Sequence, residues 1–395
     1  MKKKFSDLGD LNVFRYSNGD ELRLNITDRA NHTDYITLPT NIVTFWAGRV
    51  ENGVVCLTRL EGDKLVNKTL KECRTTDAAI HTATREIGID GGTQLFLGYQ
   101  TKARVEFIPI SAACKMSITN RSKVSIAGEL NEDDFGISPI ALAKVYEDSV
   151  KKYAENIRCA VVYGKVIGIM SEIFSPIPQD ELVDTVLRVL HERHANAEVI
   201  SGSISNRITS VDFDLKETIV ENGLQVEILT TLLNSDNGYS AVRLVPCCRF
   251  AGKSTVYPFH DDGWASNHVS LDMEAIAEGV DTMFMNLRDT VSLLANAQTR
   301  VLQYPYVYTE KVIEQLNRWA TNKGGAKITK HAAKDILCRV DTLVSQNIIS
   351  EFTVMDIADY LMDAIPQDAA MTTQDAWRKT VMRIIHVDHD AIDVV

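Results

Sequence analysis

Apolar and polar residues alternate along much of residues 1–130, and this period of two is typical of strands that are buried on one face. Two Asn-Gly pairs, a dipeptide typical of tight hairpin turns, interrupt the alternation. The pattern predicts one hairpin over residues 11–26, turning at Asn18-Gly19, and a second over residues 42–60, turning at Asn52-Gly53. It also predicts a helix over residues 76–87 and strands over 94–100 and 103–110.

Residues 131–303 mix the periods of strands and helices. Ser138 followed by Pro139 is a typical helix start, because Ser caps the free amides and Pro suits the first helical position. A second helix is predicted from Pro178, since the following apolar residues fall on one helical face. Strands are predicted over residues 159–163, 165–170, 197–201, 211–215, 224–228 and 239–250.

From residue 270 onward apolar residues recur every three or four positions, which is the spacing of amphipathic helices. Helices are predicted over residues 270–303, 309–321, 329–346, 353–365 and 373–385. We therefore expect an α+β fold with a β-rich N-terminal region (1–130), a mixed α+β core (131–303) and a helical C-terminal segment (304–395).

The composition is that of an ordinary globular protein. Of the 395 residues, 45% are hydrophobic and 24% are charged, which excludes a disordered or collagen-like chain. The seven cysteines are scattered and include no Cys-x-x-Cys pair, so neither a disulfide framework nor a zinc ribbon is predicted. The basic start of the chain lacks a following apolar stretch, and no segment has the length and hydropathy of a membrane span. We expect a cytoplasmic protein with no membrane partner.

Charge is distributed unevenly along the chain. Residues 1–130 hold 18 basic and 15 acidic residues, a net of +3, whereas residues 131–395 hold 24 and 38, a net of −14. A partner that carries phosphates is therefore expected to bind the N-terminal region, because the remainder repels polyanions. The candidate nucleic-acid contacts are the clustered cations Lys102, Arg104, Lys115, Arg121 and Lys123. Tyr99 and Phe107 lie nearby in the sequence as possible stacking surfaces for single-stranded DNA.

Two short motifs resemble parts of known catalytic sites. Residues 251–255 (Ala-Gly-Lys-Ser-Thr) end like a phosphate-binding loop, but Cys247 stands where that loop requires its first glycine and no helix follows. We interpret them as a turn at the end of a strand. His191 and His194 lie on one side of a predicted helix end, where histidines favour the helix dipole, and this explains them better than a metal site does.

The densest group of potential metal ligands consists of His260, Asp261, Asp262 and His268. Imidazole and carboxylate together suit a hydrolytic transition metal, but the alternative is a polar loop before a helix, and we expect no tightly bound metal. Asp212 and Asp214 alternate with apolar residues on a strand, so both carboxylates should lie on its solvent face. Two acids alone do not make a nuclease, and we predict no catalytic residue and no cofactor.

Several stretches resemble the phage/plasmid-like proteins of unknown function, a family carried by phages, prophages and conjugative plasmids. The resemblance rests on residues 166–177, on residues 237–248, on His268 before a long helix, and on Trp377 within residues 375–380. Arg249 departs from the family pattern, which tends to have Asn after the cysteines. The resemblance implies an origin in a phage or another mobile element and a location in the host-cell cytoplasm, and it transfers no catalytic residue. By association it also favours a role in recombination or in countering host defence.

Three functions are compatible with these observations. The first is a non-enzymatic binding protein, acting on single-stranded DNA or on host or phage proteins, and present as a homo-oligomer. The second is a virion or assembly component, and the third is a metal-dependent hydrolase that uses the loop 260–268. The acidity of most of the chain argues against tight DNA binding, so we rank the functions in this order.

Overall fold

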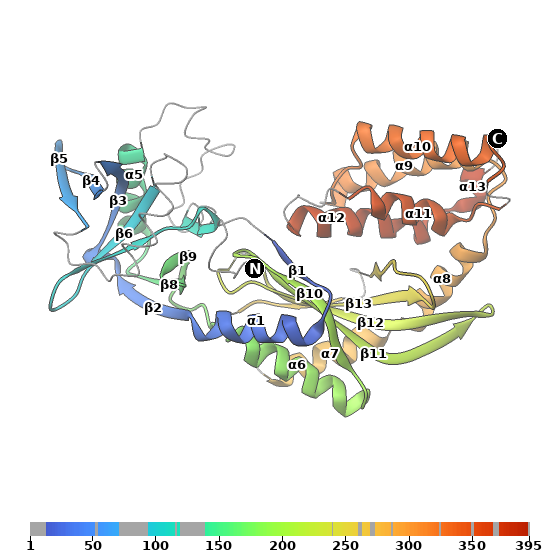
Figure 1. Ribbon diagram of the computed structural model, residues 1–395, viewed down its shortest axis with the longest axis horizontal. Helices are drawn as coiled ribbons and strands as arrows, with labels where there is room; N and C mark the ends of the chain where they lie inside the picture. Colours follow the sequence, from blue (N-terminus) through green and yellow to red (C-terminus); the bar gives the residue numbers. More distant parts are fainter. Residues whose placement is uncertain are drawn as a thin grey trace.

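The computed structural model has an α+β fold with three antiparallel sheets in the part of the chain that it describes (Figure 1). The described residues are 13–51, 54–70, 94–114, 117–118, 139–238, 240–259, 263–268, 273–285, 287–323, 325–348, 351–365 and 371–393. β-rich sheets gather toward the N-terminus and helices toward the C-terminus, as the hydrophobic pattern predicts.

A five-stranded sheet lies at one end of the molecule, in the order β5-β4-β3-β6-β7. Its strands are β3 (Val43–Glu51), β4 (Val54–Glu61), β5 (Lys64–Thr69), β6 (Gln94–Gln100) and β7 (Val105–Pro109). The predicted hairpin over 42–60 is confirmed by the pairing of β3 with β4. Helix α5 (Pro139–Tyr153) packs on this sheet, and its buried Tyr146 contacts the ring of Phe45 in β3.

A three-stranded sheet joins this end to the rest of the molecule. It has the order β2-β8-β9, with β2 (Thr33–Pro39), β8 (Asn156–Val162) and β9 (Lys165–Ser171). Apolar residues of β8 and β9 share a core with α5 and with the five-stranded sheet. The expected division at residue 130 therefore does not separate the sheets, because β2 pairs with strands from beyond it.

The largest sheet has the strand order β1-β10-β11-β12-β13-β14, with β15 also pairing with β13. Its strands are β1 (Phe14–Tyr16), β10 (Glu198–Ile204), β11 (Thr209–Glu221), β12 (Leu224–Asn234), β13 (Val242–Phe250), β14 (Tyr257–Pro258) and β15 (Trp264–Ser266). Four helices cover one of its faces: α1 (Gly19–Asn31), α6 (Gln179–Arg193), α7 (Met273–Met285) and α8 (Leu287–Thr299). Val211, Phe213 and Ile228 point into this core, so their neighbours along the strands point to the opposite face.

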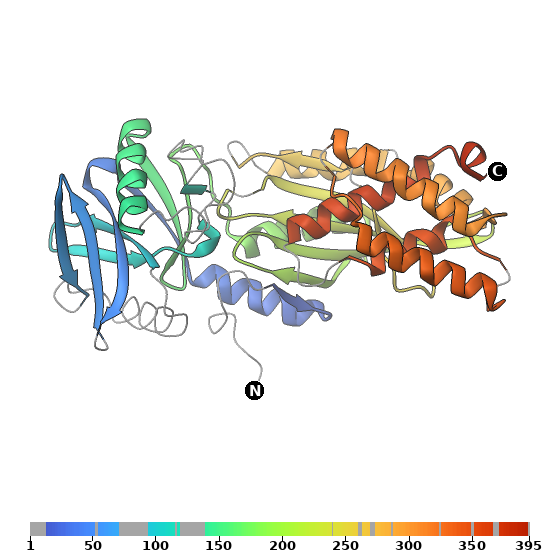
Figure 2. The same ribbon diagram turned by 90° about the horizontal axis from the view of Figure 1, so that it is seen from above.

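The C-terminal helices lie above that opposite face at one end of the sheet (Figures 1 and 2). They are α9 (Pro305–Lys323), α10 (Lys330–Ser345), α11 (Val354–Asp363), α12 (Met371–Met382) and α13 (His389–Asp393). The buried indole of Trp377 in α12 donates to the Leu361 carbonyl of α11 at 3.1 Å. The helices contact α8 and β14, and a cavity remains between α11, α12 and the sheet.

The predicted hairpin over residues 11–26 is wrong, because residues 19–31 form α1. The Asn18 side chain accepts a hydrogen bond from the Glu21 amide at 2.9 Å, which makes it a helix N-cap and not a turn residue. Leu22 and Ile26, four positions apart, are buried against the large sheet. Gly19 is needed for close approach, since a Cβ there would lie 1.8 Å from the Val199 carbonyl oxygen.

The single long helix predicted over 270–303 is also wrong. Residues 273–285 form α7 and residues 287–299 form α8. α7 contacts β13 and β15, where Gly279 packs on the Trp264 ring, whereas α8 contacts β11 and α11. The apolar period continues through both helices, so the sequence pattern alone did not separate them.

Candidate binding site between the large sheet and the C-terminal helices

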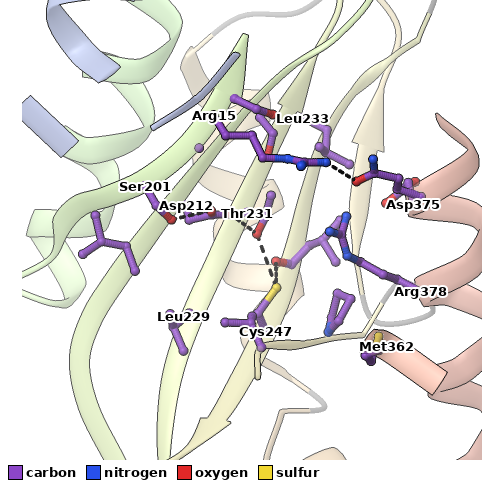
Figure 3. Close-up of a pocket in the computed structure, with 18 of the residues that line it drawn as sticks. Arg15, Ser201, Asp212, Leu229, Thr231, Leu233, Cys247, Met362, Asp375 and Arg378 are labelled. Atoms are coloured by element: carbon purple, nitrogen blue, oxygen red, sulfur yellow. Dashed lines mark hydrogen bonds between the residues drawn. The ribbon is translucent and has the colours of Figure 1, made fainter. Parts of the chain in front are cut away.

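A cavity of about 820 Å³ lies between the outer face of the large sheet and helices α11 and α12. This volume falls within the range of ~300–1,000 Å³ that is typical of small-molecule sites. Strands β10 to β13 form the floor, β1 and the segment 254–258 form two sides, and α11 and α12 form the remaining wall (Figure 3). Its lining combines charged, hydroxyl and aliphatic side chains.

A row of polar side chains crosses the floor of the cavity. Asp212 of β11 is paired in register with Ser201 of β10 and with Thr231 of β12. The two hydroxyls donate to different oxygens of its carboxylate, Ser201 to Oδ2 at 2.7 Å and Thr231 to Oδ1 at 2.7 Å. The Cys247 sulfur of β13 lies 3.5 Å from the Thr231 hydroxyl and continues the row (Figure 3).

Burial alters the acidity of two groups in this row. It raises the pKa of the Asp212 carboxyl, against the opposing effects of the Ser201 and Thr231 hydroxyls and of the Arg378 charge. It also raises the pKa of the Cys247 thiol to about 12, although the contact with the Thr231 hydroxyl opposes this shift. The thiol is therefore protonated at neutral pH, and a protonated thiol is a poor nucleophile.

Two guanidinium groups enter the cavity from different walls. Arg15 of β1 donates from Nη2 to Gln374 Oε1 of α12 at 3.0 Å and so links the sheet to the helices. Arg378 of α12 extends toward the sheet, and its charge reaches Asp212 and Cys247 (Figure 3). In the part of the chain that the structure describes, Arg378 makes no hydrogen bond or ion pair, whereas the neighbouring Asp375 lies 3.5 Å from Arg243.

The motif at residues 251–255 forms a turn between β13 and β14, as we interpreted it, with Gly252 at a φ of +80°. Lys253 points away from the cavity, because its Nζ lies 3.5 Å from Asp359 Oδ2 and 3.2 Å from Gln298 Oε1. Ser254 and Thr255 line the cavity, but the Thr255 hydroxyl is bonded to Tyr257, which lies outside the lining.

The predicted nucleic-acid residues are only partly described. Lys102 and Arg104 lie in the exposed loop between β6 and β7, and Arg104 forms an ion pair with Glu106 of β7. Lys115, Arg121 and Lys123 lie outside the described residues. Phe107 is buried edge-on against Trp46, so its prediction as a stacking surface for bases is wrong. The rest of the predicted site is neither assembled nor excluded by the described residues.

Of the four possible metal ligands, His260, Asp261 and Asp262 lie outside the described residues. His268 is buried against the tilted ring of Phe174, with ring centroids 4.7 Å apart, and neither of its nitrogens has a hydrogen-bond partner among the described residues. Burial lowers its pKa, while the nearby Asp236 opposes that change. Among the described residues, no group of three or more His, Cys, Asp or Glu side chains could hold a metal ion.

The other candidate motifs have structural roles. His191 bonds the Ala197 carbonyl at 2.6 Å, and His194 lies 2.6 Å from Glu217, so the pair holds the end of α6. Asp214 lies 3.1 Å from Lys216 Nζ, outside the cavity. The interpretation of these histidines as a helix end is confirmed.

The expectation that Asp212 faces solvent is wrong, because the C-terminal helices cover the face of the sheet to which it points. Arg15 belongs to no motif, and Arg378 lies in the stretch 375–380, whose family resemblance transfers no role to it. The alternation around Asp212 identifies its face correctly, but it cannot indicate which distant segment covers that face.

No family model, curated protein or solved structure matches this chain. Within the described residues, no helix is both long enough and apolar enough to cross a membrane.

Proposed function

We propose that this chain is a non-enzymatic binding protein that holds a small, anionic ligand in the cavity between the large sheet and α11–α12. The observation that carries the proposal is Arg378, a half-buried guanidinium that lines the cavity without an ion pair in the described structure. A guanidinium in such a position favours a carboxylate or phosphate, with which it can form two parallel hydrogen bonds.

The surrounding groups also favour binding over catalysis. The Cys247 thiol has a pKa of about 12, so it would be a weak nucleophile. Asp212 is held by two hydroxyl donors, Ser201 and Thr231, and no histidine lines the cavity among the described residues. Such a fixed acceptor orients a ligand better than it transfers protons.

The proposal can be tested with inorganic phosphate as the probe. Phosphate should raise the melting temperature of the protein relative to chloride at equal ionic strength, because a ligand that binds only the folded state stabilises it. Arg378→Gln should remove this increase. Lys379→Gln is the matched control, since it removes the same charge from the next residue of α12, which does not line the cavity. Equal responses of the two variants, or no response of the wild type, would reject the proposal.

Binding of single-stranded DNA by the N-terminal region remains a separate prediction, as does an origin in a phage or another mobile element. The exposed position of Lys102 supports DNA binding, and the ion pair between Arg104 and Glu106 weakens it. The small-ligand proposal depends on neither prediction.

A further inference from the structure

We infer that the ligand of this cavity is a guanine nucleotide, bound with its base on Asp212 and its phosphate near Arg378. This inference rests on the proposed function, because it names the ligand class of the same site. Three features of the lining carry it: the acceptor positions of Asp212, the guanidinium of Arg378, and the aliphatic side chains on two walls.

Asp212 can accept two further hydrogen bonds side by side. Each of its oxygens already accepts one bond, from Ser201 or from Thr231, and a carboxylate offers about four acceptor positions in total. One position therefore remains on each oxygen. Among the common bases, only guanine presents two adjacent N–H donors on one edge, at N1 and at the 2-amino group.

The charges of the cavity favour a ligand with a neutral donor edge and an anionic tail. Three aspartates line the cavity beside Arg15 and Arg378, namely Asp212, Asp363 and Asp375. Asp363 lies 3.5 Å from Arg339 and Asp375 lies 3.5 Å from Arg243, so each of these two carboxylates has a cation of its own. Arg378 has no counter-ion at ion-pair distance among the described residues, so it favours an anionic group on the ligand. A phosphate would meet Arg378 and the hydroxyl of Ser254, which also lines the cavity. A guanine nucleotide carries a neutral donor edge and a phosphate at opposite ends.

The aliphatic part of the cavity lining suits a flat ring. Leu229 and Val245 line it from the sheet, while Met362 and Ile365 line it from the segment at and after the end of α11. Aliphatic side chains on two walls bury the faces of a planar base, and polar groups at the ends fix its orientation.

The test compares guanosine and adenosine monophosphates by isothermal titration calorimetry on the full chain. The two share the sugar and phosphate, but the adenine edge has one amino group beside an acceptor nitrogen. We expect guanosine monophosphate to bind roughly tenfold or more tightly than adenosine monophosphate, because a bidentate contact to a base typically discriminates against other bases by at least this factor. Asp212→Asn should remove this preference, because an amide offers one acceptor where the carboxylate offers two.

Asp214→Asn is the matched control, since it makes the same change two residues along β11, outside the cavity. It should leave the preference intact, and thermal unfolding of both variants checks that each is folded. Equal affinity for the two nucleotides, or an unchanged preference in Asp212→Asn, would overturn the inference. Tighter binding of free arginine, or binding of a guanine-containing oligonucleotide without the mononucleotide, would also overturn it.

The failure of this inference can be distinguished from the failure of the proposed function. Phosphate binding that depends on Arg378 but shows no base preference would keep the function and reject the guanine ligand. If Arg378→Gln weakened the binding of neither phosphate nor the nucleotides, both the proposed function and the guanine ligand would be rejected.

Discussion

The guanidinium of Arg29 contacts both carboxylate oxygens of Asp236 inside the protein. Its Nη2 lies 3.2 Å from Oδ1 and 3.0 Å from Oδ2, and both side chains are almost fully buried. Arg29 lies near the end of α1, one turn before β2 begins, while Asp236 lies in the turn after β12. Next to Asp236, Asn237 donates to the Ile167 carbonyl of β9 at 3.2 Å. The ion pair therefore stabilises the junction between the large sheet and the three-stranded sheet.

Asp236→Asn should lower the free energy of unfolding by about 3–5 kcal/mol, because it leaves the buried Arg29 charge without its counter-ion. Urea denaturation followed by circular dichroism measures this loss. The control is Asp184→Asn, which breaks the exposed pair with Arg23 (2.8 Å) and should cost under about 1 kcal/mol. Similar losses in the two variants would show that the buried pair has no special role.

The raised pKa of Asp212 predicts a pH-dependent cost of folding. In the folded state its pKa lies above 3.8, the ordinary value that applies to the unfolded chain. Between the unfolded-state pKa and the folded-state pKa, the folded protein binds a proton that the unfolded chain has lost. The contribution of Asp212 to the free energy of unfolding therefore falls as pH rises through that interval, and it reaches its lowest value above the folded-state pKa. Asp212→Asn does not titrate, so its unfolding free energy relative to the wild type should rise as pH increases from about 4. A difference that is constant between acidic and neutral pH would contradict this prediction.

The Cys247 thiol should resist alkylation in the folded protein. With a pKa of about 12, roughly one thiol in ten thousand is ionised at about pH 8, and the side chain is buried. The exposed Cys338 provides the internal comparison. Peptide mass spectrometry after brief iodoacetamide treatment should find Cys338 modified and Cys247 intact, with both modified in denaturant. Equal rates in the folded protein would mean that the thiol is activated.

Asn18→Ala should destabilise the protein by about 1 kcal/mol, because it removes the side-chain oxygen that caps α1. Asn18→Ser restores an N-cap acceptor and should recover most of that loss. Chemical denaturation of the two variants against the wild type measures both values. If Asn18→Ala were neutral, the bond to the Glu21 amide would not stabilise the helix.

Single-stranded DNA, if it binds the five N-terminal cations, should show a salt slope of at most about 3.5, since each neutralised phosphate adds about 0.7. Glu106→Gln should strengthen binding, because it releases Arg104 from its ion pair. Glu314→Gln makes the same change at an exposed pair in α9 and should have no effect. Fluorescence anisotropy at several salt concentrations tests both variants, and an absence of binding at low salt would exclude DNA as a partner of this region.

Local patterns predicted those elements whose cause lies within a few residues. Apolar residues at helical spacing predicted α9 to α12, and the start of α11 is fixed locally by a capping box, in which Thr353 and Asp356 form reciprocal bonds of 2.8 and 3.2 Å. Alternation predicted the pairing of β3 with β4. The hairpin predicted at Asn18-Gly19 was wrong because Asn favours both hairpin turns and helix caps. Only the burial of Leu22 and Ile26 decides between the two structures.

The candidate site could not be predicted because its walls come from distant parts of the chain. The alternation around Asp212 shows that its side chain lies opposite Val211 and Phe213, but the helices that enclose it begin at residue 354. Arg378 resembles any other helical arginine until α12 is placed above the sheet. Its role depends on tertiary packing, which no local spacing encodes.

The hydrogen bond between Arg15 and Gln374 joins residues that are 359 positions apart. During synthesis, β1 leaves the ribosome long before α12 exists, so the first 350 residues cannot form the complete cavity. Binding of the proposed ligand would consequently distinguish molecules that contain α12 from molecules terminated before it. A nonsense mutation ahead of the codon for Arg378 would abolish that binding while leaving the large sheet encoded.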